Sequence, residues 1–404
     1  YQGKAIPLSL AGKIGVNMAK ETINVSSLAL SIAGESINAS AAVSGWKLAP
    51  QVNFSVSSSG INVDPLLAIF AGAAPAKPQA KPKPGALTKT INAATTAIPR
   101  NIGLNGNINI NNLTFQKFKV DKAVLGLSLA RKVASASIKE IRIYEGVLSG
   151  NARVDLNTPG LSYSANNLKL SNFNASPFTN AVVETFLTTL PDYKDMVNKV
   201  YGRLDVAASL NGRGVEPQDI MSNLVADASV TIKEGELKRV KTLAEVGKML
   251  KSNTLQGDMK FGIMVAECGM KNKVVNVKNL KLEEPEIKVH FKGGVDLGRL
   301  AWVSGNRLTL KAAPSVTKDL PKEFSLFRDD KGWVELTFEM TGGLTKPIPK
   351  PILDKPLEVG IGKVKAKIEA QKVEIVKQAS AEVEKAKEQL KQEAEKKIKD
   401  FLKF

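Results

Sequence analysis

The sequence contains very few of the side chains on which most enzyme chemistry depends. Its 404 residues include one histidine, His290, and one cysteine, Cys268. This excludes a zinc site built from several histidines and cysteines, and it also excludes an intrachain disulfide. Strand alternation places His290 on the same face as Lys288 and Glu286, so we expect an imidazole that faces solvent or lies at a strand edge. Cys268 ends a strand-like run, which is typical of a small apolar filler.

Other features of catalytic and membrane-spanning proteins are also missing. Aromatic residues make up 5% of the chain, and no apolar stretch reaches the roughly 20 residues of a membrane-spanning helix. The segment Gly212-Arg213-Gly214 lacks the strand, lysine and helix of a phosphate-binding loop. The carboxylates of Glu283 and Glu284 are adjacent in sequence, so they point apart on a strand or loop. We therefore expect a protein that is not an enzyme and that carries no cofactor and no metal.

Positive charge is the most unusual part of the composition. Lys and Arg number 57 against 39 Asp and Glu, a formal net charge of +18. The basic residues are scattered singly, with few aromatic residues between them and no recognisable DNA- or RNA-binding motif, so no nucleic acid partner is expected. A dispersed cationic surface suits anionic lipid head groups better, because these require charge rather than the geometry of base edges. An alternative stays open, in which the charge only keeps an elongated protein soluble.

Alternation of apolar and small polar residues is the dominant pattern. In the N-terminal segment it runs through Ile37, Ala39, Ala41 and Val43 and then through residues 52–56, with glycines between the runs. A period of two is typical of antiparallel strands that bury one face. Similar runs recur between residues 108 and 340, separated by Gly, Asn and Asp. The sequence therefore predicts a mainly β protein with a few helices.

Helical patterns occur in three places. Ser176 and Pro177 form a helix start, and apolar spacing continues to residue 201. Residues 241–252 carry an apolar stripe of the same kind. The tail, residues 363–404, contains no proline or glycine and is rich in Lys, Glu, Ala and Gln. This tail predicts one long helix of roughly 63 Å at 1.5 Å per residue.

Two stretches rich in proline and lysine divide the chain. Residues 73–85 read AAPAKPQAKPKPG and residues 346–356 read KPIPKPILDKP, compositions that are typical of extended, solvated linkers. The expected organisation is an N-terminal β segment at 1–72, a linker at 73–100, a β domain at 101–345 with a helical insert at 177–201, a second linker at 346–362 and the long charged helix at 363–404.

The passage from residue 143 to residue 250 has a distinctive order of elements. It begins with a strand pair, continues with a helical insert and ends with a strand passage that contains spaced glycines. The residues that define the pattern are Tyr144, Gly146, Gly150, Asp155, Gly202, Leu210, Gly212, Gly214, Asn223, Leu224, Glu234, Gly235 and Leu237. Their order and spacing resemble the C-terminal region of the AsmA family, and residues 62–67, NVDPLL, resemble a motif of that family's middle region. Asp227 departs from the pattern, because the family usually has glycine there, so the local turn is left open.

The resemblance implies a periplasmic envelope protein of Gram-negative bacteria, anchored in the inner membrane by a segment N-terminal to Tyr1. Larger relatives are regarded as bridge-like lipid-transfer proteins, in which an elongated, curled antiparallel β-sheet forms an apolar groove. For this chain the resemblance implies a role in outer-membrane biogenesis, in which the protein holds or transports phospholipid or another anionic envelope lipid. Strands with one apolar face are compatible with such a groove if no second layer covers them.

Candidate groove-lining residues are the apolar side chains in the clearest alternations: Leu204, Val206, Ala208, Leu210, Val230, Ile232, Phe261, Ile263 and Val265. The same residues fit an alternative, the packed core of a closed sandwich. A different function also stays open, that of a scaffold whose basic surface and helix 363–404 bind polyanionic envelope components or a partner protein. A third possibility is an extracellular β-rich filament or adhesin subunit that self-associates at its sheet edges.

Overall fold

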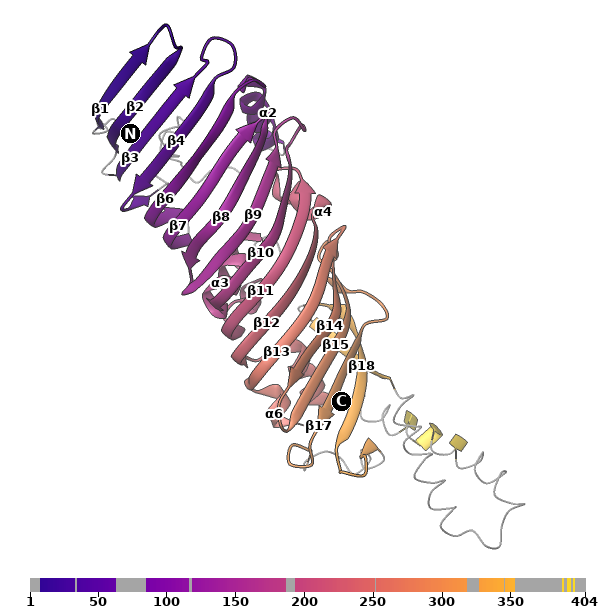
Figure 1. Ribbon diagram of the computed structural model, residues 1–404. Helices are drawn as coiled ribbons and strands as arrows, with labels where there is room; N and C mark the ends of the chain where they lie inside the picture. Colours follow the sequence, from indigo (N-terminus) through magenta and orange to yellow (C-terminus); the bar gives the residue numbers. More distant parts are fainter. Residues whose placement is uncertain are drawn as a thin grey trace, which may run out of the picture. The chain divides into compact units, whose positions relative to one another are not determined.

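The computed structural model describes residues 8–32, 35–62, 85–115, 118–186, 193–250, 252–317, 327–344, 346–352, 387–388, 391–393 and 395–396 (Figure 1). This part of the chain is mainly β, as the alternation predicts, with strands β1 to β19 in one large mixed sheet and helices α2 to α6. It divides into two compact units. Unit 1 comprises residues 1–189, 203–230 and 269–273, and unit 2 comprises residues 190–202, 231–268 and 274–404, so β11 to β13 contribute to both.

Unit 1 is built mainly from consecutive antiparallel strands. Neighbours pair antiparallel from β1 to β4 and again from β6 to β11, whereas β4 and β6 pair in parallel. The short β5 also pairs in parallel with β6. The strands are β1 (Leu8–Asn17), β2 (Thr22–Ile32), β3 (Glu35–Ser44), β4 (Gln51–Ser58), β5 (Ile61–Asn62), β6 (Gly103–Phe115), β7 (Phe118–Ala130), β8 (Val133–Ile143), β9 (Gly146–Asp155), β10 (Ser162–Asn174), β11 (Val200–Arg213) and the first part of β12 (Val225–Leu237).

Two-residue turns fix the register of the central strands. Arg131 and Lys132 join β7 to β8, and Tyr144 and Glu145 join β8 to β9, all four with positive φ. Positive φ at both central residues defines a type I′ turn, whose twist matches that of the strands it connects. The hairpins therefore hold the side chains of β7, β8 and β9 in fixed rows.

Three helices of unit 1 accompany the sheet: α2 (Ala86–Ala97), α3 (Ala175–Phe186) and α4 (Pro217–Asn223). Helix α2 lies at the strand ends, where the Asn92 side chain accepts a hydrogen bond from the Gly160 N–H at 2.8 Å and Lys132 Nζ donates to the Thr95 carbonyl at 2.9 Å. Helix α3 packs through Phe178, whose ring meets that of Phe173 edge-on at 5.5 Å. Both helices are therefore fixed to turns and strand ends of the sheet.

Unit 2 combines the rest of β12 with a second group of strands and two short helices. Strands β14, β15, β17, β18 and β19 pair antiparallel in that order, and β16 pairs with β15 and β18. Its elements are η1 (Tyr193–Met196), α5 (Lys241–Met249), α6 (Asn253–Gln256), β13 (Met259–Lys271), β14 (Val274–Glu283), β15 (Ile287–Asp296), β16 (Ala301–Trp302), β17 (Arg307–Ala312), β18 (Val334–Gly343) and β19 (Lys346–Ile352).

The core of unit 2 is densely buried. Alternate residues of β18 have at most 5% of their surface exposed, namely Val334, Leu336, Phe338 and Met340. Helix α5 contacts β19 and buries Leu243 and Val246, and Leu250, the residue directly after the helix, is buried as well. The Asn306 side chain is also buried, because its amide donates to the Val303 and Met340 carbonyls and its oxygen accepts from the Met340 N–H. Unit 2 thus has the packed interior of an ordinary globular domain.

Several predicted boundaries are wrong. The linker expected at 73–100 contains helix α2, whose sequence ALTKTINAATTA has no proline. The segment before it is not a separate domain, because β4 pairs with β6. The linker expected at 346–362 begins with strand β19, in which prolines alternate with residues that can donate hydrogen bonds to β18.

The helices predicted at 177–201 and 241–252 are present in the structure. Helices α3 and η1 lie in or at the edge of the predicted insert at 177–201, and α5 lies in the predicted helix at 241–252. The long helix expected at 363–404 falls almost entirely outside the described residues; the few that are described, 387–388, 391–393 and 395–396, are helical. Asp227, where a turn was left open, lies inside β12.

Candidate functional site

One face of the unit 1 sheet carries continuous rows of apolar side chains. In each row, every residue is the direct partner of the next across neighbouring strands, so the rows run from strand to strand across the sheet. We call this the apolar face. Its first row is Val16, Ile23, Val43, Val52, Leu104, Leu129, Ala134 and Val154; the second is Ile14, Val25, Ala41, Phe54, Gly106, Leu127, Ala136, Ala152, Ala165 and Leu210; the third is Gly12, Leu28, Ala39, Val56, Ile108, Leu125, Ile138 and Gly150.

A fourth row lies beside these three. It includes Leu10, Leu30 and Ile37 on the first three strands. From β6 to β11 it continues as Ile110, Ala123, Ile141, Leu148, Leu170 and Val206.

The opposite face of the same strands is polar. A matching row crosses from β4 to β11 on this face and consists of Asn53, Asn105, Ser128, Ser135, Arg153, Ser164 and Asn211. Because successive side chains of a strand point to opposite faces, the alternation places most polar side chains on this face. Val124, between Asn109 and Glu140, is an apolar exception. We call this side of the sheet the polar face.

Side chains of the apolar face are only partly removed from solvent. Of the large side chains in the four rows, Leu129 alone is buried; those on β1 are exposed and the others are half-buried. Ten strands at the usual spacing of about 4.8 Å give the face a width of about 43 Å across the strands. Monomeric soluble proteins rarely leave a continuous apolar patch of this size open unless it binds something.

One end of the apolar face is closed by helix α3. Phe173 and Leu204 are direct partners on β10 and β11 and are 1% and 3% exposed. Phe178 of α3 contacts the Phe173 ring, and Gly146 of β9 leaves room for that ring, because a Cβ there would lie 2.4 Å from it. The exposed part of the face therefore begins beyond this aromatic cluster.

The other end of the unit 1 strands, near α2, carries basic residues in its turns: Lys20, Lys47, Arg100, Arg131 and Lys132. Some of these have partners, since Lys47 lies 3.2 Å from Glu21 and Arg100 donates two hydrogen bonds to the Asn157 side chain. An apolar face with basic residues along one side suits a ligand with an apolar body and an anionic head.

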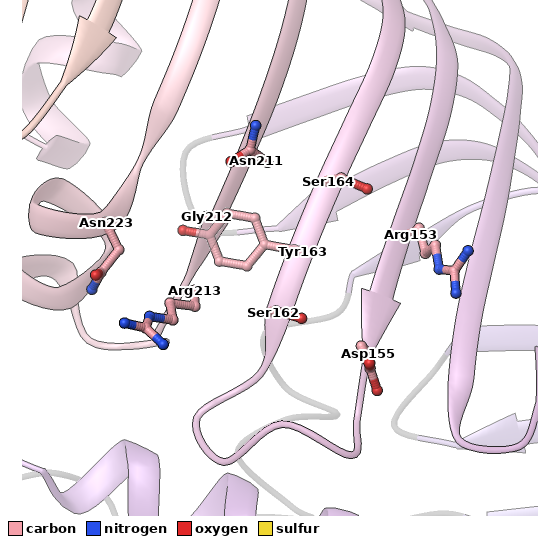
Figure 2. Close-up of a pocket in the computed structure, with 9 residues that line it drawn as sticks. All are labelled: Arg153, Asp155, Ser162, Tyr163, Ser164, Asn211, Gly212, Arg213 and Asn223. Carbon is pink, nitrogen blue, oxygen red and sulfur yellow. The ribbon is translucent and has the colours of Figure 1, made fainter.

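A polar hollow of about 420 Å³ lies on β9, β10, β11 and α4 (Figure 2). Figure 2 shows the Tyr163 ring lying over Gly212, with Arg153 and Arg213 pointing away from it. A Cβ at Gly212 would lie 2.7 Å from the Tyr163 hydroxyl oxygen, so glycine is needed for this contact. Burial raises the pKa of Tyr163.

Carboxylates at the strand ends of unit 1 are held ionised. Arg203 Nη1 donates a hydrogen bond to Glu145 at 2.6 Å and Asn174 donates a second, and these lower the pKa of Glu145. Hydrogen bonds from Lys122 and Arg142 lower the pKa of Glu140 in the same way. The Asn157 side chain and N–H both donate to Asp155 and lower its pKa. Such carboxylates order the strand ends and stay charged at neutral pH.

The predicted groove-lining residues separate into two groups. Leu204, Ile232 and Phe261 are buried, with at most 4% of their surface exposed. The expectation that they line an open face is wrong, because Leu204 packs in the aromatic cluster and Phe261 lies against Gly235. The remaining candidates are half-buried or exposed, as a lining residue requires: Val206, Ala208, Leu210, Val230, Ile263 and Val265.

Of these, Val206, Ala208 and Leu210 lie on the apolar face of unit 1, since they pair with Leu170, Leu168 and Ala165. The predicted groove-lining residues all lie on β11, β12 and β13, so they do not include the larger part of the apolar face, which lies on β1 to β9. The alternation in these strands was visible, but the register that joins them into rows is not encoded in any single segment.

The two lone reactive residues have ordinary surroundings. His290 is exposed to solvent and lies on β15, between β14 and β17, in the middle of the sheet and not at a strand edge. Its Nε2 is 3.6 Å from Glu283. Cys268 is half-buried in β13. Among the described residues, no group of three or more His, Cys, Asp or Glu side chains could hold a metal ion.

Comparison with family models, curated proteins and solved structures found no match to this chain. The AsmA resemblance of residues 143–250 therefore stays a prediction. None of the described helices is long and apolar enough to cross a membrane.

Proposed function

We propose that this protein binds phospholipid without chemical change, with the acyl chains against the apolar face of unit 1. The observation that supports this most strongly is the half-buried state of four in-register apolar rows. Each CH₂ group that leaves water for such a surface contributes about 0.8 kcal/mol, so one acyl chain along a row gains enough to be retained.

The rest of the proposal follows from the AsmA resemblance and from charge. In this proposal the protein acts in the periplasm of a Gram-negative envelope, contributes to outer-membrane biogenesis and takes phospholipid or another anionic envelope lipid. The net charge of +18 and the basic turns near α2 support an anionic head group. The alternative scaffold function rests on the basic surface and on the long helix predicted at 363–404. These residues lie almost entirely outside the described part of the chain, so no structural observation favours the alternative.

A neighbouring pair of residues on β11 tests the proposal. Val206 lies on the apolar face and is half-buried, whereas Ala207 is exposed on the polar face. We expect purified protein to carry phospholipid that mass spectrometry detects after extraction. The Val206→Glu variant should lose most of this lipid because a carboxylate would lie among the acyl chains, and Ala207→Glu should retain it.

Circular dichroism of both variants separates loss of binding from loss of fold. If the folded wild-type protein carries no phospholipid and takes none up from vesicles, the proposal is wrong. It is also wrong if both substitutions reduce the bound lipid equally.

A further inference from the structure

The polar face of unit 1 is built mainly from small, uncharged side chains. Beside the row that runs from Asn53 to Asn211, a second row crosses the strands from β4 to β10. It consists of directly paired residues: Ser55, Asn107, Gly126, Ser137, Asn151 and Asn166. The two rows together contain one charged side chain, that of Arg153. Asparagine and glycine are depleted in β-strands, so strand formation alone does not explain this composition.

The corresponding face in unit 2 shows what a merely solvated sheet face looks like in this protein. One row opposite the core consists of Lys281, His290, Thr309 and Thr337. The next row consists of Glu283, Lys288, Lys311 and Glu335, with Lys288 Nζ 4.0 Å from Glu283. Charged side chains and threonine are thus sufficient for solvation, and the ladders of asparagine and serine are particular to unit 1.

Two shallow hollows lie on the polar face. The hollow of Figure 2 places Arg153, Ser164 and Asn211 on the successive strands β9, β10 and β11. A second hollow, of about 450 Å³, extends over β6 to β10 and is also lined by Arg153 and Ser164. The two hollows therefore adjoin, and we call them together the polar trough.

Gly126 lies in the second hollow and is not required by the packing of the sheet. Its φ is not in the left-handed region, and a Cβ there would lie 3.7 Å from the Ser137 Cβ and 3.9 Å from Asn107 Oδ1, which are ordinary contacts. Gly106 differs, because a Cβ there would lie 2.4 Å from the Phe54 carbonyl oxygen. A glycine inside a strand that no neighbour requires often marks a place where a ligand approaches the backbone.

The charges in the polar trough are mostly positive. Lys139 and Arg153 line the second hollow, and no carboxylate is among the described residues that line it. The first hollow contains Arg153, Arg213 and one carboxylate, Asp155, which already accepts hydrogen bonds from the Asn157 side chain and N–H. Within the described part of the chain, neither Lys139 nor Arg213 has an ion-pair partner. The trough is therefore complementary to a negatively charged ligand.

We propose that the polar trough binds an oligosaccharide whose sugars carry carboxylate groups. Asparagine and serine side chains both donate and accept hydrogen bonds, as sugar hydroxyls do. Lys139, Arg153 and Arg213 supply the cations for the sugar carboxylates. The inference does not depend on the proposed lipid function, because the polar trough and the apolar face lie on opposite sides of the sheet.

A comparison of two anions separates sugar recognition from general attraction to the net charge of +18. The probes are an oligogalacturonate of four sugars and a capped peptide of four glutamates, which carry the same number of carboxylates. Isothermal titration calorimetry should give at least about tenfold tighter binding of the oligogalacturonate, because the peptide lacks hydroxyls for the asparagine and serine rows.

Filling the trough tests the site without a change of charge. Gly126→Val should weaken oligogalacturonate binding by about tenfold or more, because the new side chain occupies the second hollow. The fold should be retained, since valine favours strands. The matched control is Gly15→Val on the polar face of β1, outside both hollows, where a Cβ would lie 4.0 Å from the Asn24 carbonyl oxygen. This variant should bind like the wild type, and thermal unfolding checks that both variants are folded.

A charge-matched pair tests the cations. Lys139→Gln should weaken oligogalacturonate binding several-fold, because it removes a charge-assisted hydrogen bond to a sugar carboxylate. Lys292→Gln removes the same charge from an exposed position on β15 in unit 2 and should leave the affinity unchanged.

The proposal is overturned if the wild-type protein binds no oligogalacturonate at about 1 mM, the weak limit of specific binding. It is also overturned if the glutamate peptide binds equally tightly, or if either matched pair of variants shows equal affinities. Phospholipid bound to Gly126→Val, measured by mass spectrometry, reports separately on the proposed function, because this substitution leaves the apolar face unchanged.

Discussion

The two units use the same strand pattern with opposite results. In unit 2, the row Leu282, Val289, Leu310 and Leu336 runs through directly paired residues that are 1–5% exposed. In unit 1, the row Leu28, Val56, Ile108, Leu125 and Ile138 is equally apolar and equally well aligned, but its side chains are half-buried.

The difference lies in what accompanies the strands. Helix α5 in unit 2 has its own buried apolar stripe and contacts β19, whereas α2 and α3 in unit 1 are fixed at turns and strand ends. Alternation therefore determines which face of a sheet is apolar, but not whether that face becomes a core or a binding surface. The half-buried rows of unit 1 are the surface on which we propose that the lipid lies.

A matched pair of leucines gives the largest expected difference. Leu310 is 3% exposed in unit 2 and Leu125 is half-buried in unit 1, and both lie on strands with neighbours on each side. Leu310→Ala should lower the free energy of unfolding by about 2–5 kcal/mol because it leaves a closed cavity. Leu125→Ala should lower it by about 1 kcal/mol, since the side chain is already partly solvated. Urea denaturation followed by circular dichroism measures both, and equal losses would remove the distinction between the units.

Substituting a matched pair of asparagines should give the second-largest difference in stability. Asn306 is 1% exposed, and its side chain satisfies both the N–H and the carbonyl of Met340. Asn306→Ala leaves these buried groups unpaired and should cost about 1–3 kcal/mol. Asn107→Ala, on the exposed polar face of unit 1, should change stability by less than about 0.5 kcal/mol. Comparable losses in the two variants would show that unit 2 has no more of a closed core than unit 1.

The smallest effect is a dependence of stability on pH in unit 1. Hydrogen bonds lower the pKa of Glu145 below its ordinary value of 4.5. A carboxylate whose pKa is lower in the folded state contributes stability above its unfolded-state pKa, and this contribution is lost as the pH falls from there through the folded-state pKa. Thermal unfolding below pH 4.5 should therefore show a slightly smaller decline for Glu145→Gln than for the wild type. An identical decline would mean that the Arg203 contact contributes nothing measurable.

Much of the fold could be predicted because short-range sequence patterns determine the individual strands and helices. Period-two alternation gave the β class, the apolar stripe at 241–252 gave α5, and the Ser176-Pro177 start lies within the first turn of α3. Proline-rich composition was misleading at β19, because the spacing of the prolines, and not their number, decides whether a strand can form.

The site could be predicted only in part, because it depends on long-range pairing. Val206, Ala208 and Leu210 were chosen from alternation, and they do lie on the apolar face of unit 1. Phe261 has the same alternation but is buried, because Gly235 lets its ring approach the neighbouring backbone. The parallel pairing of β4 with β6 joins the N-terminal rows to the rest, and it leaves no signal in either strand alone.

The central claim, that acyl chains lie on the apolar face of unit 1, can be tested by fluorescence quenching. Ile108→Trp places a reporter in the third row of that face, and Asn107→Trp places one on the polar face of the same strand. Each variant is mixed with phospholipid brominated on its acyl chains, and the signal of the three native tryptophans is subtracted. Our account predicts strong quenching for Ile108→Trp and little for Asn107→Trp. Equal quenching of both variants, or none of either, would contradict it.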